Sequence, residues 1–447
     1  MEPIKLTIGT WGPENSGADP FGGPTKSWAV ITRPDDRIEA EIEQRKKLTD
    51  ATLAKIAKAN KESVAAARAR GEKNPEAWVI KAVSFHDADL WPDDASDEQV
   101  SEFIDWLKAK LKKYDLEVQC FTTNLFSHPV FRAGALTSFL GEVRDAAVVK
   151  ACRGVRAAIL LGAKNIIFWG GREGTEVYEQ DPVTALDNFM RLSKIVVDYG
   201  FAMGYDGTFT FEPKFYEPRF DLYAGCSGDL GALISKYFSD GRYKGKVGIN
   251  PEVPQHSAMI NRSPVLEVAQ CLASEHLISV IHFGGQRAGR MDSDFPPGFG
   301  GNIFDDFNIA KLLLAHIDEW GGVVEFDCRP LRTTTEPGQI VNFIKWCIYY
   351  WRILEKKVEI CLNDPIMEKI EAELAADKSK ADETIIYVTD EELIKAVENL
   401  ADATPSLDVL SKLPTDISEA KACRLLQIIM GVEEEGAYVF EGQPWNN

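Results

Sequence analysis

The chain has 447 residues, of which 45% are hydrophobic, so it can bury a large core as one big domain with a smaller unit. Its 50 Lys and Arg against 69 Asp and Glu give a net charge of −19, which argues against binding to nucleic acid or to an anionic membrane. An acidic surplus is typical of a solvated surface, although some of the carboxylates could gather around a divalent metal.

The cysteines and the apolar runs narrow the class of protein further. The 8 cysteines are scattered without a CxxC pair, which argues against a disulfide framework and against a structural zinc site. The first residues lack the charged and long apolar regions of a signal peptide, and no apolar run approaches the roughly 18 residues of a membrane span. We therefore expect a soluble cytoplasmic protein without a membrane partner.

Short strand-like runs alternate with longer helical patterns as far as about residue 355. The expected strands, rich in β-branched and aromatic residues, are 6–11, 82–86, 118–122, 165–169, 208–212, 247–250, 278–282 and 322–327. Eight strands that alternate with helices predict an α/β fold, namely a closed (β/α)8 TIM barrel. An open dinucleotide-binding sheet is disfavoured because no GxGxxG motif follows the first strand.

The same patterns predict the domain organisation. Residues 1–355 would form the catalytic barrel, with a helical insertion at about 37–71 where Glu, Lys, Arg and Ala predominate. Beyond them, 356–447 is expected to be a mostly helical C-terminal extension. Such an arm can cap its own barrel or wrap a neighbouring subunit. We favour the second arrangement, and with it a homo-oligomer, either a dimer or a tetramer.

Functional groups of a TIM barrel gather at the carboxyl ends of its strands, and four consecutive strands here end near ionisable side chains. These side chains are Glu212, Glu252, His282 and Asp327. Three converging carboxylates repel one another unless a cation lies between them. An oxygen-rich set with one imidazole suits Mg²⁺, Mn²⁺ or Co²⁺ better than a structural zinc ion, so we predict a divalent-metal site.

Other candidate residues occupy the remaining strand ends and one loop. The strand-end residues are Trp11, His86 with Asp89, Thr122 with Phe126, Trp169, and Lys214 two residues after Glu212. The loop after the seventh strand contributes Asp292 and Asp294, two carboxylates that could bind a second divalent ion with His256 nearby in sequence. A solvated loop remains the alternative for this DxD pair.

Four motifs in this chain resemble the xylose isomerase family. They are FHDAD at 85–89, FTTNLFSHPVF at 121–131, FWGGREG at 168–174 and EPKFYEPR at 212–219. A further motif, DPFG at 19–22, is similar to the family loop that reaches into a neighbour's active site. The matches run in order from Trp11 to about Thr333, and the helical tail is similar to the family's C-terminal arm.

The resemblance implies a role for each matching residue. His86, oriented by Asp89, would assist opening of the cyclic sugar by proton transfer, and Lys214 would hydrogen-bond the carbonyl oxygen. The metal that binds substrate hydroxyls would be held by Glu212, Glu252 and Asp327, and the second metal by Asp292 and Asp294. The walls that exclude water would be Trp11, Phe126, Trp169 and a neighbour's Phe21.

Three departures from the family pattern bear on the metal site. His282 stands where the family has an Asp, and an imidazole there favours Mn²⁺ or Co²⁺ over Mg²⁺. Rhamnose isomerase and tagatose epimerase are similar to this chain in having a His at that metal position. Gln255 stands where the family has a His, with His256 one residue later, and Arg329 replaces a family Lys.

The function expected from the resemblance is a metal-dependent aldose–ketose isomerase, acting on D-xylose or a related small sugar by ring opening and a 1,2-hydride shift. The alternative is a sugar epimerase, or a lyase on an oxidised sugar, that uses the same site with Glu212 or Glu252 as the base. A binding protein that keeps the pocket without turnover is a third possibility. The intact set of His86, Asp89, Glu212, Lys214 and Asp327 argues against it, because a binding protein needs no acid, base and ammonium in one pocket.

Overall fold

The computed structural model describes most of the chain in two compact units, Met1–Glu355 and Lys356–Asn447. The described residues are 2–14, 30–174, 180–214, 217, 221–223, 225–254, 263–290, 293–331, 333–334, 336–376, 379, 381, 389–413 and 415–431. Whether the first unit is the catalytic domain and the second an oligomerisation arm stays a prediction.

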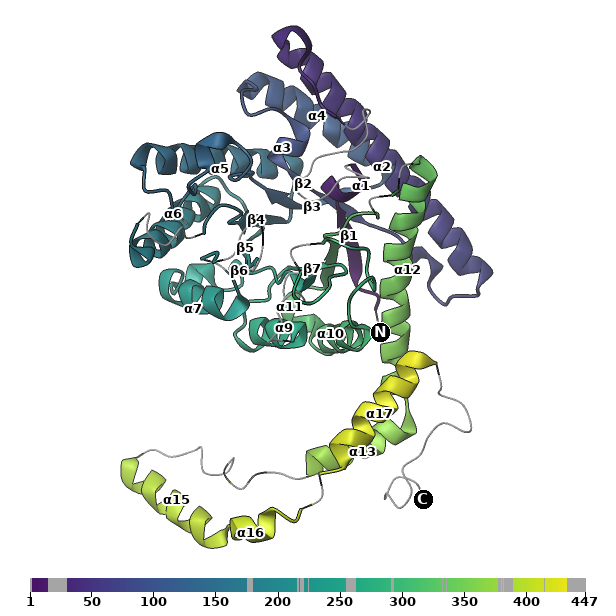
Figure 1. Ribbon diagram of the computed structural model, residues 1–447, viewed down its shortest axis with the longest axis vertical. Helices are drawn as coiled ribbons and strands as arrows, with labels where there is room; N and C mark the ends of the chain where they lie inside the picture. Colours follow the sequence, from purple (N-terminus) through teal and green to yellow (C-terminus); the bar gives the residue numbers. More distant parts are fainter. Residues whose placement is uncertain are drawn as a thin grey trace. The chain divides into compact units, whose positions relative to one another are not determined.

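The first unit is built on eight parallel strands that lie at its centre (Figure 1). In chain order they are β1 (Lys5–Gly9), β2 (Ala82–His86), β3 (Glu117–Thr122), β4 (Asn165–Trp169), β5 (Thr208–Glu212), β6 (Val247–Ile249), β7 (Val280–Phe283) and β8 (Val323–Phe326). Their order is β6-β5-β4-β3-β2-β1-β8-β7. Parallel bridges from Ile249 to Leu277 and from Glu252 to His282 join the two outer strands, so the predicted TIM barrel is confirmed.

Helices surround the strands on the outside of the barrel (Figure 1). The longer ones are α2 (Ile38–Ala69), α4 (Asp97–Tyr114), α5 (Gly141–Leu161), α6 (Pro182–Ala202), α7 (Ser227–Tyr237), α9 (Pro264–Ala273), α10 (Ile303–Ala315) and α12 (Pro337–Leu362). Short helices are α1 (Trp11–Glu14), α3 (Asp87–Leu90) and α11 (Ile317–Trp320). Side-chain caps begin several of them, since the Ser96 hydroxyl accepts the Gln99 N–H of α4 and the Asp181 carboxylate accepts the Thr184 N–H of α6.

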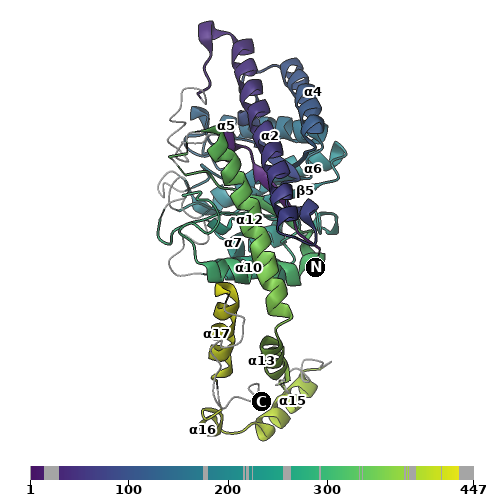
Figure 2. The same cartoon turned by 90° about the vertical axis from the view of Figure 1, so that its right-hand side faces the viewer.

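The segment expected to be a helical insertion forms one continuous helix, α2. It is the long helix between β1 and β2, so it serves as the helix of the first βα unit rather than as an addition to it. Its Asn60 amide bonds both the N–H and the C=O of Ile80, at 2.8 Å each, just before β2. It also runs beside α12 (Figure 2), where Lys345 pairs with Glu62 at 2.8 Å.

The two faces of the strands carry different side chains, because successive residues of a strand point in opposite directions. One face carries buried phenylalanines that pack against the helices, as Phe211 does on Phe189 of α6 and Phe283 on Trp351 of α12. The other face carries buried polar groups that bond across strands; Asn165, for example, donates to the Thr210 hydroxyl at 2.9 Å. The barrel interior therefore holds polar groups below the site, beside an apolar cluster of Cys120, Ile167, Val280 and Val323, and a second hydrophobic layer lies between the strands and the helices.

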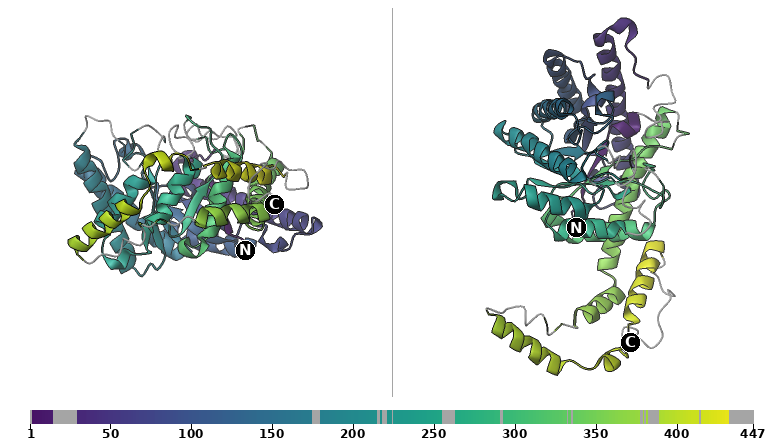
Figure 3. Two further views of the ribbon diagram at one scale, coloured as in Figure 1. Left: turned by 90° about the horizontal axis from the view of Figure 1, so that it is seen from below. Right: turned by 60° about the vertical axis from the view of Figure 1, so that its left-hand side comes forward.

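Among its described residues, the second unit consists of helices alone, drawn in the green to yellow colours at the C-terminal end of the colour bar (Figure 3). They are α13 (Pro365–Ala376), α15 (Asp390–Ala403), α16 (Leu407–Leu410) and α17 (Ile417–Met430). α13 and α17 pack together, with Lys421 paired to Glu371 at 2.9 Å and Arg424 to Asp364 at 2.5 Å. No helix in the described part of the chain is long and apolar enough to cross a membrane.

Removing the buried guanidinium of Arg352 should destabilise the barrel unit. Arg352 donates to the carbonyls of Ile4 at 2.9 Å and Ala77 at 2.8 Å and pairs with Glu355 at 2.7 Å, so it joins the chain before β1, the chain before β2 and α12. Arg352→Met removes the positive charge beside Glu355 and leaves that carboxylate only the N–H donors of Ile4 and Trp351, so we expect a loss of about 3–5 kcal/mol in the free energy of unfolding by urea. Lys345→Met, which removes a more exposed ion pair from the same helix, should cost about 0–1 kcal/mol. Equal losses in the two variants would contradict this role for Arg352.

Candidate metal centre

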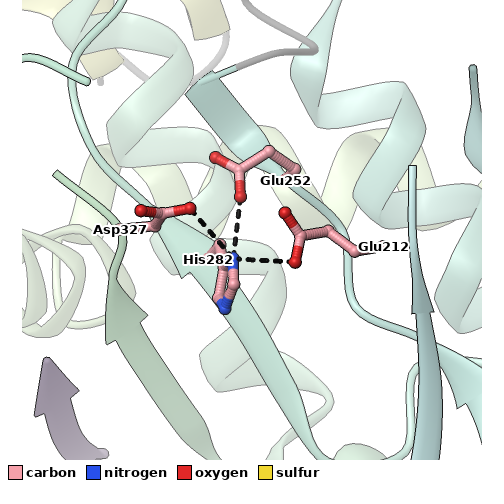
Figure 4. Close-up of side chains that lie close together, drawn as sticks. All are labelled: Glu212, Glu252, His282 and Asp327. Carbon is pink, nitrogen blue, oxygen red and sulfur yellow. Dashed lines mark hydrogen bonds and ion pairs between the residues drawn. The ribbon is translucent and has the colours of Figure 1, made fainter. Parts of the chain in front are cut away.

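Four side chains meet at the carboxyl ends of neighbouring strands (Figure 4). Glu212 ends β5, Glu252 follows β6, His282 lies in β7 and Asp327 follows β8. One ligand atom from each lies within 4.8 Å of the others, and all four residues are at most 5% exposed. The Nδ1 atom of His282 lies 2.8 Å from Glu252, 3.4 Å from Asp327 and 3.6 Å from Glu212. The structure thus brings together the four residues predicted to hold the first metal.

Glu325 fixes the orientation of the His282 ring. The Nε2 atom of His282 lies 3.1 Å from Glu325 Oε1, and the other oxygen of Glu325 accepts hydrogen bonds from the hydroxyls of Thr7 and Ser84. A neutral imidazole with its proton on Nε2 presents the lone pair of Nδ1 to the three carboxylates, as a metal ligand must.

Glu325 was not among the site residues predicted from the sequence. A signal was nevertheless present, since Glu325 lies two residues before Asp327 and therefore points to the same face of its strand. A carboxylate in an otherwise apolar strand of a buried sheet needs a partner, and here that partner is a predicted metal ligand.

The electrostatics of the cluster favour an added cation. Burial alone would lower the pKa of His282, but Glu212, Asp327 and Glu252 outweigh it and raise that pKa well above the ordinary value. Burial raises the pKa of Glu252 well above its usual range, against the opposing effects of Lys214 and His282. Moreover, Oε1 of Glu252 is buried and has no hydrogen-bond partner among the described residues. Three buried carboxylates, one oriented imidazole and an unsatisfied oxygen fit a divalent ion of the Mg²⁺, Mn²⁺ or Co²⁺ type.

Lys214 brings a fixed positive charge to the same cluster. Its Nζ lies 3.0 Å from Glu217, 3.4 Å from both Glu212 and Asp327, and 3.7 Å from Glu252. Burial would raise the pKa of Asp327, yet Lys214 and His282 hold it well below its ordinary value. The ammonium therefore lies where it can contact a substrate oxygen that faces the metal ligands.

His86 and Asp89 form a dyad at the end of β2. The Asp89 carboxylate accepts the backbone N–H of His86 at 2.9 Å and lies 3.2 Å from His86 Nδ1. Burial would lower the pKa of His86, but the Asp89 charge and hydrogen bond outweigh it and raise that pKa. Thr122 ends the adjacent strand opposite His86 and is buried.

Aromatic side chains connect this dyad to the metal cluster. The Trp11 ring lies 4.5 Å from the His86 ring, and its indole N–H donates to Asp327 at 2.7 Å. The Phe126 ring lies 5.8 Å from His86 and 4.1 Å from Trp169, and the Trp169 ring lies 5.5 Å from the Lys214 ammonium. The predicted wall residues Trp11, Phe126 and Trp169 are therefore brought together around His86 and Lys214.

The residues predicted for the second ion are less completely described. Asp292 and His256 lie outside the described residues, as does Phe21 of the predicted wall. Asp294 is described, and it is not one of the four side chains that meet at the metal centre. Its carboxylate instead pairs with Arg329 at 3.0 Å.

Comparisons with known proteins address the fold. No protein-family model matches the sequence. The structure is similar to that of L-ribulose 3-epimerase, at 14% identity over 84% of this chain and 99% of that chain, with a TM-score of 0.51. The chain shares the barrel fold of that protein. The TIM barrel predicted from the sequence is thereby confirmed as a fold.

Two further solved structures match at lower scores. D-psicose 3-epimerase from Clostridium cellulolyticum H10 matches at 11% identity over 79% of this chain and 99% of that chain, with a TM-score of 0.49. A xylose isomerase-like TIM barrel protein from Mycobacterium smegmatis, solved in complex with magnesium, matches at 15% identity over 79% of this chain and 97% of that chain, with a TM-score of 0.43.

The contact between Glu325 and His282 gives a direct test of the metal centre. We expect Glu325→Gln to weaken Mn²⁺ binding about 10- to 100-fold. The amide has no negative charge, so it holds the His282 ring less firmly in the orientation that directs Nδ1 at the metal. Isothermal titration of the metal-free chain measures this affinity, and His282→Ala should abolish binding at the same site. A matched control is Glu267→Gln, which changes another buried carboxylate, one that accepts the Ser227 N–H at 2.9 Å. Unchanged Mn²⁺ affinity in both Glu325→Gln and His282→Ala would contradict the assignment.

Proposed function

We propose that this chain is a divalent-metal-dependent enzyme that isomerises or epimerises a small sugar. The observation that carries the proposal is the grouping of Glu212, Glu252, His282 and Asp327 beside both Lys214 and the aromatic wall around His86. Each part supplies something that rearrangement of a sugar requires: a cation for its oxygens, a proton donor and acceptor for ring opening, and walls that exclude water.

Opening of a cyclic sugar requires a proton to move at the ring oxygen or at the anomeric hydroxyl. His86 can perform this transfer, since its ring stands against Trp11 and Phe126 and its Nδ1 lies 3.2 Å from Asp89. Asp89 would keep the ring in one orientation and stabilise its protonated form.

The chemistry after ring opening takes place next to a carbonyl group. A divalent ion held by Glu212, Glu252, His282 and Asp327 would bind sugar oxygens and polarise that carbonyl. Lys214 would donate a hydrogen bond to the carbonyl oxygen and stabilise the negative charge that develops on it. Trp169 and Phe126 would keep water from this region, which strengthens both electrostatic effects.

The first candidate reaction is aldose–ketose isomerisation by a 1,2-hydride shift, on D-xylose or a related aldose. It is supported by the His86–Asp89 dyad, the Lys214 ammonium and the aromatic wall, all at the positions that the sequence motifs predict. A hydride shift moves the hydrogen with its electron pair directly from one carbon to the next. A dry site favours it, because water would divert the polarised sugar to proton exchange.

The second candidate reaction is sugar epimerisation, in which one carboxylate of the cluster removes a proton beside the carbonyl and another carboxyl group returns a proton to the opposite face of that carbon. It is favoured by His282 as the imidazole member of the cluster and by the fold shared with L-ribulose 3-epimerase. Glu212 or Glu252 would be the base, since both lie in the cluster within 4 Å of Lys214.

Solvent exchange separates the two reactions. The Mn²⁺-loaded chain is incubated with a panel of aldoses and ketoses in D₂O. If hydride moves, the product should carry no carbon-bound deuterium. If a carboxylate transfers the proton, the product should carry about one deuterium per turnover. Mass spectrometry of the product measures this. If no sugar of the panel is converted while Mn²⁺ still raises the melting temperature, the pocket binds without turnover and both reactions are contradicted.

The pH dependence of the reaction tests His86 as the acid. The Asp89 carboxylate raises the pKa of His86, so the protonated ring persists to higher pH and its action as an acid is lost as pH rises through that pKa. Asp89→Asn removes the charge, so the alkaline limb of kcat/KM should move to lower pH and kcat/KM should fall about 10- to 100-fold at neutral pH. An NMR titration of His86 should show the same shift. A pH profile unchanged by the substitution would contradict the role of the dyad.

A further inference from the structure

Asp87 directly follows His86 in the chain, and its side chain is buried. Its Oδ1 atom accepts the backbone N–H of Asn124 at 2.7 Å and that of Ala88 at 2.8 Å. Asn124 lies two residues after the end of β3, and β3 pairs with β2 so that Thr122 stands opposite His86. A carboxylate beside the proposed acid therefore ties the end of β2 to the chain after the neighbouring strand.

Lys150 of α5 contacts both partners of this hydrogen bond. Its ammonium donates to the Asn124 carbonyl at 2.7 Å and lies 3.6 Å from Asp87 Oδ2. It also pairs with Asp93 at 2.6 Å. Burial raises the pKa of Asp87, against the opposing effects of Lys150 and the Asn124 N–H. The ammonium thus favours the ionised form of Asp87, which is the stronger acceptor for the N–H groups.

The packing of α5 brings Lys150 to the chain after β3. A Cβ atom on Gly154, one turn after Lys150, would overlap the Thr123 hydroxyl and lie 3.2 Å from the Thr123 Cβ atom. Glycine permits this close approach because it has no side chain. The distance between the Lys150 ammonium and Asn124 is therefore set by how α5 packs on the end of β3.

The Asn124 side chain fixes the turn that carries Phe126. Its Oδ1 atom accepts the N–H groups of Phe126 at 3.1 Å and Ser127 at 2.8 Å, and its Nδ2 atom donates to the Ser127 hydroxyl at 2.8 Å. Arg172 adds a hydrogen bond to the Phe126 carbonyl at 3.2 Å. In this arrangement the Phe126 ring stands at 82° to the His86 ring, with 5.8 Å between the centroids. Asn124 is thus held through its backbone and holds the aromatic wall through its side chain.

We propose that Lys150 and Asn124 are positioning residues for ring opening, and that they hold the His86 and Phe126 rings in one fixed arrangement. The inference rests on the proposed function, because it concerns the step assigned to His86. A proton passes between His86 and a sugar oxygen only within hydrogen-bonding distance, so a small displacement of the ring or of the adjacent wall slows this step.

NMR of the metal-free, full-length chain tests the arrangement without a substrate. The chain has 6 histidines, so selective ¹³C labelling of histidine gives few signals, and His86→Gln identifies the signal of His86. An aromatic ring shifts the resonance of a proton beside it, so the His86 ring protons report the position of Phe126. We expect Lys150→Met to change this resonance, and Lys150→Arg, which keeps the charge and hydrogen-bond donors, to restore it in part. An unchanged resonance in folded Lys150→Met would overturn the inference.

Two controls separate a moved ring from a lost charge. In a Phe126→Leu background, Lys150→Met should change the His86 resonance no further, because the reporting ring is gone. A change that persists there comes from the lost charge alone and would overturn the inference. Arg153→Gln removes the next cation along α5, which pairs at 3.0 Å with the exposed Asp97. It should leave the His86 resonance and turnover unchanged, and an effect equal to that of Lys150→Met would count against a specific role for Lys150.

Asn124→Ala provides a test that does not depend on the folding of the Lys150 variants. It removes the side-chain bonds to Phe126 and Ser127 but keeps the backbone groups that contact Asp87 and Lys150. We expect the His86 resonance to change as in Lys150→Met. The double variant Lys150→Met/Asn124→Ala should change it no more than the larger single effect, because both residues act through the same turn. Fully additive changes would overturn the inference.

Turnover measures the consequence for ring opening. With D-xylose, or another cyclic aldose that the Mn²⁺-loaded chain converts, Lys150→Met and Asn124→Ala should lower kcat about 10- to 100-fold while KM stays nearly constant. A raised KM with unchanged kcat would place these residues in sugar binding and overturn the inference. If the unmodified chain converts no sugar, the proposed function fails, whereas failure of the inference alone leaves turnover intact in both variants.

Discussion

Three carboxylates buried around one imidazole repel one another, and much of the structure around the barrel rim serves to hold them together. The Glu212, Glu252 and Asp327 side chains cannot relieve that repulsion by turning to solvent, since each is at most 5% exposed. Lys214 supplies one positive charge within 4 Å of all three. A single ammonium does not balance three buried carboxylates, so the proposed divalent ion is the natural completion of the cluster.

The interior of the barrel supports this cluster from below. Thr7 and Ser84 bond the carboxylate of Glu325, which in turn bonds His282, so three different strands fix the orientation of one metal ligand. These partners are adjacent because β1 pairs with both β2 and β8, and β8 with β7. These polar groups inside the barrel are thus part of the site rather than a defect in the core.

The aromatic wall joins two halves of the proposed chemistry. The Trp11 ring contacts the His86 ring at a tilt, and its indole N–H donates to Asp327, so the residue proposed for ring opening and a proposed metal ligand share one neighbour. Phe126 and Trp169 continue the wall to Lys214. Their bulk keeps the dielectric low where charge develops, which makes the ammonium and the proposed ion more effective.

By itself, the sequence determined the fold class and four members of the candidate metal centre. Strand-like runs and the polar residues that end them are local patterns, and in a parallel barrel all strand ends lie at one rim, so Glu212, Glu252, His282 and Asp327 could be placed together in advance. The sequence also indicated a long helix at about 37–71, but only the structure made α2 the helix of the first βα unit.

Only the tertiary structure decided which charges face one another inside the barrel and at its rim. The contact of Glu325 with His282 depends on the pairing of β7 with β8, and the ion pair of Arg329 with Asp294 depends on how the loop after β7 folds back. Both pairs join residues more than thirty positions apart whose separation carries no periodic signal. Such contacts follow from strand register and loop closure, which local sequence patterns do not specify.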